Sequence, residues 1–219
     1  MEPRVKSSSF LAAMLASLFA LGSVASAQSI ENAFDFKDFE RISISGVYHL
    51  YVTVGEGYGV TVLGPAAEME RVDVSLKGST LRLGLRDRRF GEKRMKSDGL
   101  QARITLPSLT GLHMSGVVDG EVYGITGDSF DVAISGVGEM RLYGECGRLN
   151  AEVSGVGGLD GAGLKCSDVR VVVSGVGKAS VFASESVDAV VSGMGDITVL
   201  GSPKHVKKSG GMFAEISIR

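Results

Sequence analysis

The chain has 219 residues, of which 31 are glycine and 4 are proline, and its formal net charge is −2. This length is enough for one domain, and the near-neutral charge argues against nucleic acid as a partner. The glycines lack the every-third-residue period of collagen, and most of them follow short apolar segments, so they indicate turns.

Residues 1–27 have the features of a signal peptide. A short basic region precedes the apolar segment Phe10–Leu21, which is short for a full membrane span. Ala25-Ser26-Ala27 matches the small-x-small pattern of cleavage sites. A retained membrane anchor is the alternative interpretation. Cleavage is favoured, and it predicts an exported chain, periplasmic or extracellular, with no transmembrane span after cleavage.

The N-terminal half of the exported chain carries short strand patterns. Residues 28–38 form a polar leader that adds either a first strand or a flap. Arg41–Val54 alternates apolar and polar residues, as a strand with one buried face does. Pro65–Glu70 is the one stretch with helical character. Further strands are expected at Val60–Leu63, Val72–Leu76, Leu81–Leu85 and Leu100–Leu106.

The segment 86–99 interrupts the strand pattern with a cluster of basic residues. One hypothesis is a basic finger that contacts an acidic partner or a glycan. The alternative, which is favoured, is a solvated connecting loop, because such loops tolerate charge and insertion. The candidate partner residues are Arg86, Arg88, Arg89, Lys93, Arg94 and Lys96.

Residues 112–201 repeat the sequence Ser-Gly-x-Gly. The four full copies begin at Ser135, Ser154, Ser174 and Ser192, and a degenerate copy contains Ser115. A fixed period near 20 residues is typical of stacked repeats. Alternating apolar residues before and after each corner predict two short strands per coil, stacked about 4.8 Å apart around a continuous core.

The predicted fold is therefore all-β: a parallel β-helix or β-solenoid with coils of about 20 residues. The chirality of parallel crossovers favours a right-handed coil. Residues 39–218 are expected to form this single domain, with the irregular strands of residues 39–111 capping one end. Gly201–Gly211 is expected to be a polar loop, and Met212–Arg219 a strand that caps the other end.

Glycines are expected to shape each corner, either through a positive φ or through close approach of the backbone. They are Gly136, Gly138, Gly155, Gly157, Gly175, Gly177, Gly193 and Gly195.

The two cysteines occupy the same position in consecutive repeats, since Cys146 and Cys166 each precede a repeat serine by eight residues. Their Cα atoms should then lie one rung apart, about 5 Å, within the range that a disulfide tolerates. An exported protein also meets an oxidising compartment. Two buried thiols are the alternative, but turn-like surroundings favour the disulfide.

None of the motifs indicates catalysis. A nucleophilic serine needs a base and an orienting partner, but none of the histidines, His49, His113 and His205, recurs with the repeat. The serines are therefore predicted to bond to corner backbone. Gly157–Gly161 resembles a calcium-binding β-roll repeat, but only one copy exists. No catalytic residue, cofactor or metal is expected.

The combination of motifs resembles the putative autotransporter adhesin head GIN domain family. The resemblance rests on the four corners, on Ile104–Leu109 and on the closing Gly210-Gly211, and it covers Phe39 to Ile218. It implies a β-helix-like domain in secreted or envelope-associated bacterial proteins, with a name that suggests adhesion. The family often has a small residue between the corner glycines, whereas this chain has Val137, Val156, Val176 and Met194. These four are interpreted as additional core rather than as an outward contact stripe.

The leading functional hypothesis is a non-catalytic, exported, adhesin-like module of the cell envelope that binds a glycan, a surface or a protein. A β-helix carbohydrate-active enzyme, either a polysaccharide lyase or a hydrolase, is the alternative, and a structural spacer is a third. The exposed ends of a solenoid also leave open the association of copies into a homo-oligomer.

Overall fold

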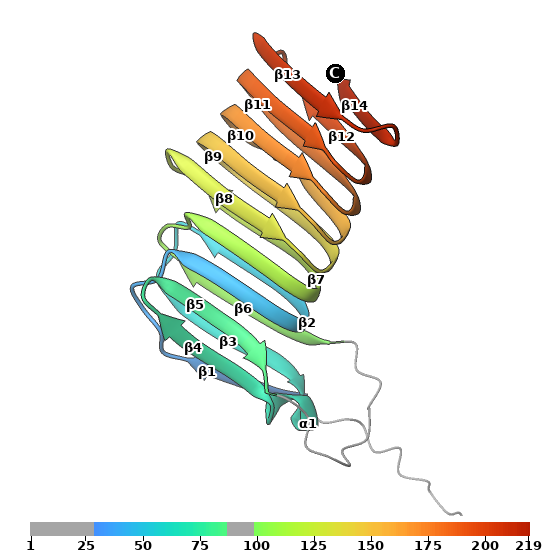
Figure 1. Cartoon of the computed structure of the whole chain (residues 1–219). Helices are drawn as coiled ribbons and strands as arrows, with labels where there is room; N and C mark the ends of the chain where they lie inside the picture. The colour runs from blue at the N-terminus through green and yellow to red at the C-terminus, as the bar shows by residue number, and fades with distance from the viewer. Residues whose placement is uncertain (1–28, 87–98) are drawn as a thin grey trace, which may run out of the picture.

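The computed structural model describes residues 29–86 and 99–219, which form a stack of flattened coils (Figure 1). Fourteen strands join in one hydrogen-bonded array. Along the stack, every pair of neighbouring strands from β2–β7 to the C-terminal end is parallel. The fold is a β-solenoid, as the repeat predicts. The elements are β1 (Ser29–Phe34), β2 (Arg41–Val54), β3 (Gly59–Pro65), α1 (Ala66–Met69), β4 (Val72–Lys77), β5 (Thr80–Leu85), β6 (Leu100–Leu106), β7 (Gly111–Ile125), β8 (Ser129–Ile134), β9 (Val137–Val153), β10 (Val156–Val173), β11 (Val176–Val191), β12 (Met194–Leu200), β13 (His205–Gly210) and β14 (Ala214–Ile218).

Each regular coil has two sheet segments and two corners. We call the sheet whose segments precede a Ser-Gly corner the pre-corner sheet, and the sheet whose segments follow it the post-corner sheet. The long strands β9, β10 and β11 begin in the post-corner sheet, continue through the second corner and end in the pre-corner sheet. In the register of β10 with β11, Val156 pairs with Val176 and Val171 pairs with Ala189. Equivalent residues of successive coils therefore stack directly on one another.

The core lies between the two sheets and runs along the solenoid axis. Its side chains are the alternating apolar residues that the repeat pattern assigns to the inward face, and all of them are buried. The pre-corner sheet contributes Phe130, Val132, Ile134, Leu149, Ala151, Val153, Val169, Val171, Val173, Val187, Ala189 and Val191. The post-corner sheet contributes Met140, Leu142, Leu159, Ala179, Val181, Ile197 and Val199.

The N-terminal part closes one end of the stack with antiparallel strands. The leader forms β1, which pairs with β3, and β4 pairs with β5 in a hairpin around Lys77-Gly78-Ser79. Strand β2 lies inside the stack, because it pairs with β5 and β6 on one side and with β7 on the other. The first long strand in the sequence is thus a full rung of the solenoid, and later strands cover it (Figure 1).

The C-terminal end corrects the expectation of a polar loop over 201–211. Residues His205–Gly210 form strand β13, which pairs with β11, and β14 pairs with β12 (Figure 1). Strand β13 has no apolar alternation and is exposed along its length, whereas Ala214, Ile216 and Ile218 of β14 take inward positions and pack against the core. Lys208 takes the inward position that Ala189 holds one rung earlier, and its Nζ donates to the Ile216 carbonyl at 3.2 Å. An inward charge of this kind protects an exposed sheet edge against further strand pairing.

Candidate functional site: the corner ladder and its groove

The repeated serine has a structural role at the corner. The Ser135 hydroxyl donates to the carbonyl of Met114, and the Ser154 hydroxyl donates to that of Ile134, at 3.2 and 3.4 Å. Each acceptor belongs to the preceding rung, so these hydroxyls join one coil to the next. This is the backbone bonding that the sequence predicts for the serines.

The corner glycines act mainly through close approach rather than through a left-handed backbone. Of the eight glycines singled out, only Gly138 has a positive φ, of 136°. A Cβ built on Gly155 would lie 1.9 Å from the Gly136 carbonyl oxygen, and one on Gly175 would lie 2.1 Å from the Gly155 oxygen. A side chain there has no room, because the backbone of the previous rung occupies its place.

The residue between the two corner glycines points outward, which corrects its interpretation as core. Met140 faces inward, so Gly138 two residues earlier also takes an inward position, and Val137 faces the solvent. Exposed fractions are 49% for Val137, 57% for Val156, 49% for Val176 and 56% for Met194. The corner does not interrupt the alternation of the strand that follows it, and this alternation places the four side chains outside.

The same outward position is apolar in three further rungs. Val47 pairs with Val117, and Val117 pairs with Val137. Phe213 stands opposite Met194, one residue before the pair of Gly195 with Ala214. We call this row of seven residues the corner ladder; at about 4.8 Å per rung it is about 29 Å long. Its members are Val47, Val117, Val137, Val156, Val176, Met194 and Phe213, the last with 71% of its surface exposed.

A groove of about 940 Å³ runs beside the C-terminal half of the ladder, on the post-corner sheet. One wall consists of the ladder residues Val156, Val176, Met194 and Phe213. The charged residues of the lining are Asp119, Glu139, Asp160, Lys178 and Asp196. Gly158 lies between Glu139 and Lys178 in register and contributes no side chain, so the lining has a gap at this rung.

The charged side chains beside the groove make bonds from rung to rung. The Asp119 carboxylate accepts from the Glu139 backbone N–H at 2.8 Å. The Arg141 guanidinium donates to Glu121 at 3.2 Å, and the Tyr123 hydroxyl donates to the second oxygen of the same carboxylate at 2.8 Å. This bond with Glu121 raises the pKa of Tyr123 above its ordinary value. The arrangement resembles a solvated polar face more than an acid–base pair.

Aromatic rings stand in the same sheet, farther from the Ser-Gly corner. The rings of Tyr123 and Tyr143 are parallel, with centroids 4.7 Å apart. The Lys165 ammonium lies 4.0 Å from the centroid of the Phe182 ring, a cation–π contact.

The pre-corner sheet carries a second row of paired charges. The Arg41 guanidinium extends past Gly111, which has no side chain, and donates to Asp131 at 2.8 Å. Asn150 donates to the other oxygen of Asp131 at 2.9 Å. These bonds, that from Asn150 first and that from Arg41 second, lower the pKa of Asp131. Farther along the row, Arg170 pairs with Asp188.

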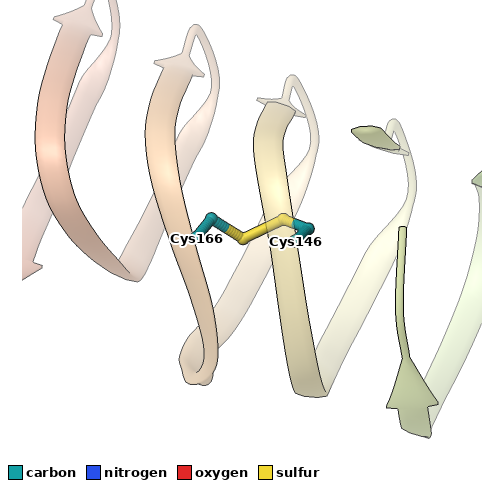
Figure 2. Close-up of a disulfide and its surroundings, with 2 residues drawn as sticks. All are labelled: Cys146 and Cys166. Carbon is teal, nitrogen blue, oxygen red and sulfur yellow. A yellow bond between two sulfur atoms is a disulfide. The ribbon is translucent and has the colours of Figure 1, made fainter. Parts of the chain in front are cut away.

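The two cysteines form a disulfide between the long strands β9 and β10 (Figure 2). Both strands run through the cysteines without a turn, which corrects the expectation of turn-like surroundings. Cys146 and Cys166 are register partners in β9 and β10, with Cα atoms 4.5 Å apart. The bridge therefore ties two consecutive coils together, as their equal positions in the repeat predict. Both cysteines are buried and contribute no surface to the groove.

Of the basic segment 86–99, the structure describes Arg86 and Gly99. Arg86 donates from its guanidinium to the Glu70 carbonyl at 2.8 Å, so it fastens the end of β5 to the turn after α1. The candidate residues Arg88, Arg89, Lys93, Arg94 and Lys96, like the signal-peptide prediction for 1–27, fall outside the described residues. Within residues 29–86 and 99–219, no group of His, Cys, Asp and Glu could hold a metal, and no helix could span a membrane.

Solved structures share this architecture. A crystal structure of a putative adhesin from Bacteroides fragilis NCTC 9343 has 26% sequence identity and a TM-score of 0.72, and the match covers 89% of this chain and 98% of that one. Putative adhesins from Parabacteroides merdae ATCC 43184 (13% identity, 88% of this chain and 96% of that one) and Parabacteroides distasonis ATCC 8503 (15% identity, 88% and 98%) both have a TM-score of 0.54 and show the fold alone.

Comparison with curated proteins finds no match. Residues 38–203 match the family described as putative auto-transporter adhesin, head GIN domain. This range begins just before the first full rung and includes every Ser-Gly corner of the solenoid. The chain therefore belongs to the head GIN domain family of putative auto-transporter adhesins.

Proposed function

We propose that this protein is an exported, non-catalytic, adhesin-like module that binds a partner at the cell envelope through the corner ladder. The observation that carries the proposal is the ladder itself, in which seven apolar side chains stand in register along one edge, each at least 44% exposed. Contiguous exposed apolar surface of this kind marks interaction sites in soluble proteins. The family and its solved relatives, named as putative adhesins, support the same function.

The ladder lies outside the buried core, which supports this interpretation. The solenoid core is complete without these side chains, because the inward positions of both sheets are already filled by buried residues. A polar residue in the ladder would have kept the edge soluble at no cost in core packing. Retaining valine or methionine there makes sense if the edge is covered by a partner.

The test measures binding of the purified protein to whole cells and envelope material by biolayer interferometry. The variant Val156→Ser with Val176→Ser removes apolar surface from the ladder on β10 and β11. Its matched control is Val172→Ser with Val190→Ser, which makes the same change on the outward face of the pre-corner sheet of the same two strands. The ladder variant should lose binding and the control should keep it. Equal binding by both would refute the proposal.

The alternative of a carbohydrate-active enzyme has a separate test. The outward carboxylates Glu139 and Asp160 lie on successive rungs, but Glu139 also contacts Arg141 at 3.5 Å, and Asp160 accepts from the Ala162 backbone N–H at 3.2 Å. A polysaccharide-depolymerisation screen that finds activity, and finds it lost in a Glu139 or Asp160 variant, would replace the binding function with catalysis.

A further inference from the structure

The groove beside the corner ladder has an apolar wall and an acidic wall. The charged residues of its lining are four carboxylates and one ammonium. That ammonium, Lys178 Nζ, is 3.9 Å from the Asp196 carboxylate, so it is directed along the rungs towards the C-terminal end. In the part of the groove next to Val156, the charged groups of the lining are Glu139 and Asp160. Arg141, the register partner of Asp160, lies 3.5 Å from Glu139, but its guanidinium also donates to Glu121 and is thereby directed towards the N-terminal rungs.

The gap at Gly158 lies between these two carboxylates. Gly158 occupies an outward position of β10, with Val156 on its ladder side and Asp160 on the other. A Cβ at Gly158 would meet its nearest atoms, Glu139 Cγ and the Lys178 carbonyl oxygen, at 3.6 and 3.7 Å, which is ordinary van der Waals contact. The backbone therefore does not require glycine here, in contrast to Gly155 and Gly157 at the corner. What glycine provides at this rung is an opening one side chain wide.

We propose that this groove binds a basic segment of a protein partner, with a Lys or Arg side chain in the gap at Gly158 and apolar side chains along the ladder. The inference rests on the proposed binding function and names the partner's chemistry. Lys and Arg suit the site because their aliphatic stems pack on apolar surface while the charged head reaches a polar group. Here the stem would lie against Val156 and the head between Glu139 and Asp160.

The charge of the groove selects against two other occupants. A second copy that met this groove with the same acidic lining would place carboxylates against Glu139 and Asp160, and like charges across an interface are unfavourable. An anionic membrane surface would be repelled for the same reason, since it attracts basic rather than acidic segments. A basic segment is the occupant for which both walls of the groove are complementary.

The test uses a fluorescein-labelled peptide of alternating Lys and Leu, with binding followed by fluorescence anisotropy. Gly158→Gln fills the gap without a backbone clash. Its matched control is Gly57→Gln, because Gly57 also has open space around a Cβ but lies in a distant turn. The gap variant should weaken binding about tenfold, which corresponds to about 1.4 kcal/mol, and the control should bind like the unchanged protein. Circular dichroism and thermal melting verify that both variants are folded.

Two further peptides separate charge from apolarity. An alternating Glu-Leu peptide and an alternating Lys-Ser peptide should both bind at least about tenfold more weakly than Lys-Leu. The inference is overturned if Gly158→Gln binds Lys-Leu as tightly as the unchanged protein, or if Glu-Leu binds equally well. Binding of phosphatidylcholine vesicles that is lost in Gly158→Gln would overturn it in favour of a lipid surface. If cell binding requires the ladder but no basic peptide binds, this inference fails and the proposed function stands.

Discussion

Alanine at Gly155 tests whether the solenoid can stack only when its corners lack side chains. The added Cβ would lie 1.9 Å from the Gly136 carbonyl oxygen, about 1.5 Å inside ordinary van der Waals contact. The same oxygen accepts from the Val156 backbone N–H at 3.0 Å. The corner can make room only by moving away from that oxygen, so the substitution strains the packing and lengthens or breaks a hydrogen bond between rungs.

The expected cost follows from these two effects. Overpacking in a well-packed region costs about 1–3 kcal/mol, and leaving a backbone group unpaired costs about 1–3 kcal/mol. Replacing glycine also reduces the entropy of the unfolded chain, and this effect stabilises the folded protein by about 0.4–1 kcal/mol. The net loss in the free energy of unfolding should be about 3 kcal/mol, which lowers Tm by about 6–12 °C for a domain of this size.

The control is Gly158→Ala, three residues further along the chain, within β10. Its Cβ meets nothing closer than 3.6 Å, so its stability should equal that of the unchanged protein or rise slightly. Thermal and guanidinium unfolding, followed by far-UV circular dichroism, measure both variants. A Gly155→Ala protein that melts together with the Gly158→Ala protein would refute the explanation of the corner glycines by close approach.

Three other predictions test the remaining features of the stack. Replacing both Cys146 and Cys166 with alanine should lower the free energy of unfolding by about 3 kcal/mol, given the 20-residue separation; a melting temperature equal to that of the oxidised protein would contradict this. Lys208→Leu should cause concentration-dependent self-association in analytical ultracentrifugation, whereas the outward Lys207→Leu should stay like the unchanged protein; monomeric Lys208→Leu would show that the end needs no charge. The lowered pKa of Asp131 means that its bonds stabilise the fold above the unfolded pKa of about 3.9 and are lost as pH falls through the lower native value. Asp131→Asn should therefore reduce the loss of unfolding free energy on acidification by at most about 1 kcal/mol, because the carboxylate is half exposed. Acid unfolding curves identical to those of the unchanged protein would contradict the assigned bonds.

Periodicity in the sequence is sufficient to predict the core and the disulfide. Residues such as Val171 and Ala189 recur at equal positions of successive repeats, and stacking places them in one column along the solenoid axis. The same regularity aligns Cys146 with Cys166. These features depend only on the repeat period and on the alternation of a strand, both of which a single sequence contains.

The direction of the ladder residues was also within reach of the sequence. Counting back from the inward Met140 by twos reaches Gly138, so Val137 has to face outward. The interpretation as core did not apply this alternation to the corner, although the strand pattern continues through it. The sequence Ile44-Ser45-Gly46-Val47 also resembles the start of the repeated corner, which indicates that Val47 belongs to the same row. The register of β2 with β7 shows this, since Val47 pairs with Val117.

Other features depend on contacts that a single sequence does not display. The position of β2 between later strands is set by stacking of segments far apart in the chain, such as Arg41 with Thr80 and with Gly111. Strand β13 lacks the apolar pattern of a buried strand, since all six of its residues are exposed, and its pairing with β11 at the end of the stack is a contact between distant segments. The gap at Gly158 becomes visible only when Glu139 and Lys178 are placed on either side of it.

The most direct test of the ladder as a contact surface is site-specific photo-crosslinking in cells that produce the full chain. A photoreactive side chain replaces Val176 in the ladder or, as the control on the same strand, Val190 on the pre-corner sheet. We predict a discrete adduct from position 176, with a cross-linked partner peptide that carries Lys or Arg beside apolar residues, and none from position 190. Adducts formed equally from both positions, or from position 190 alone, would contradict the account.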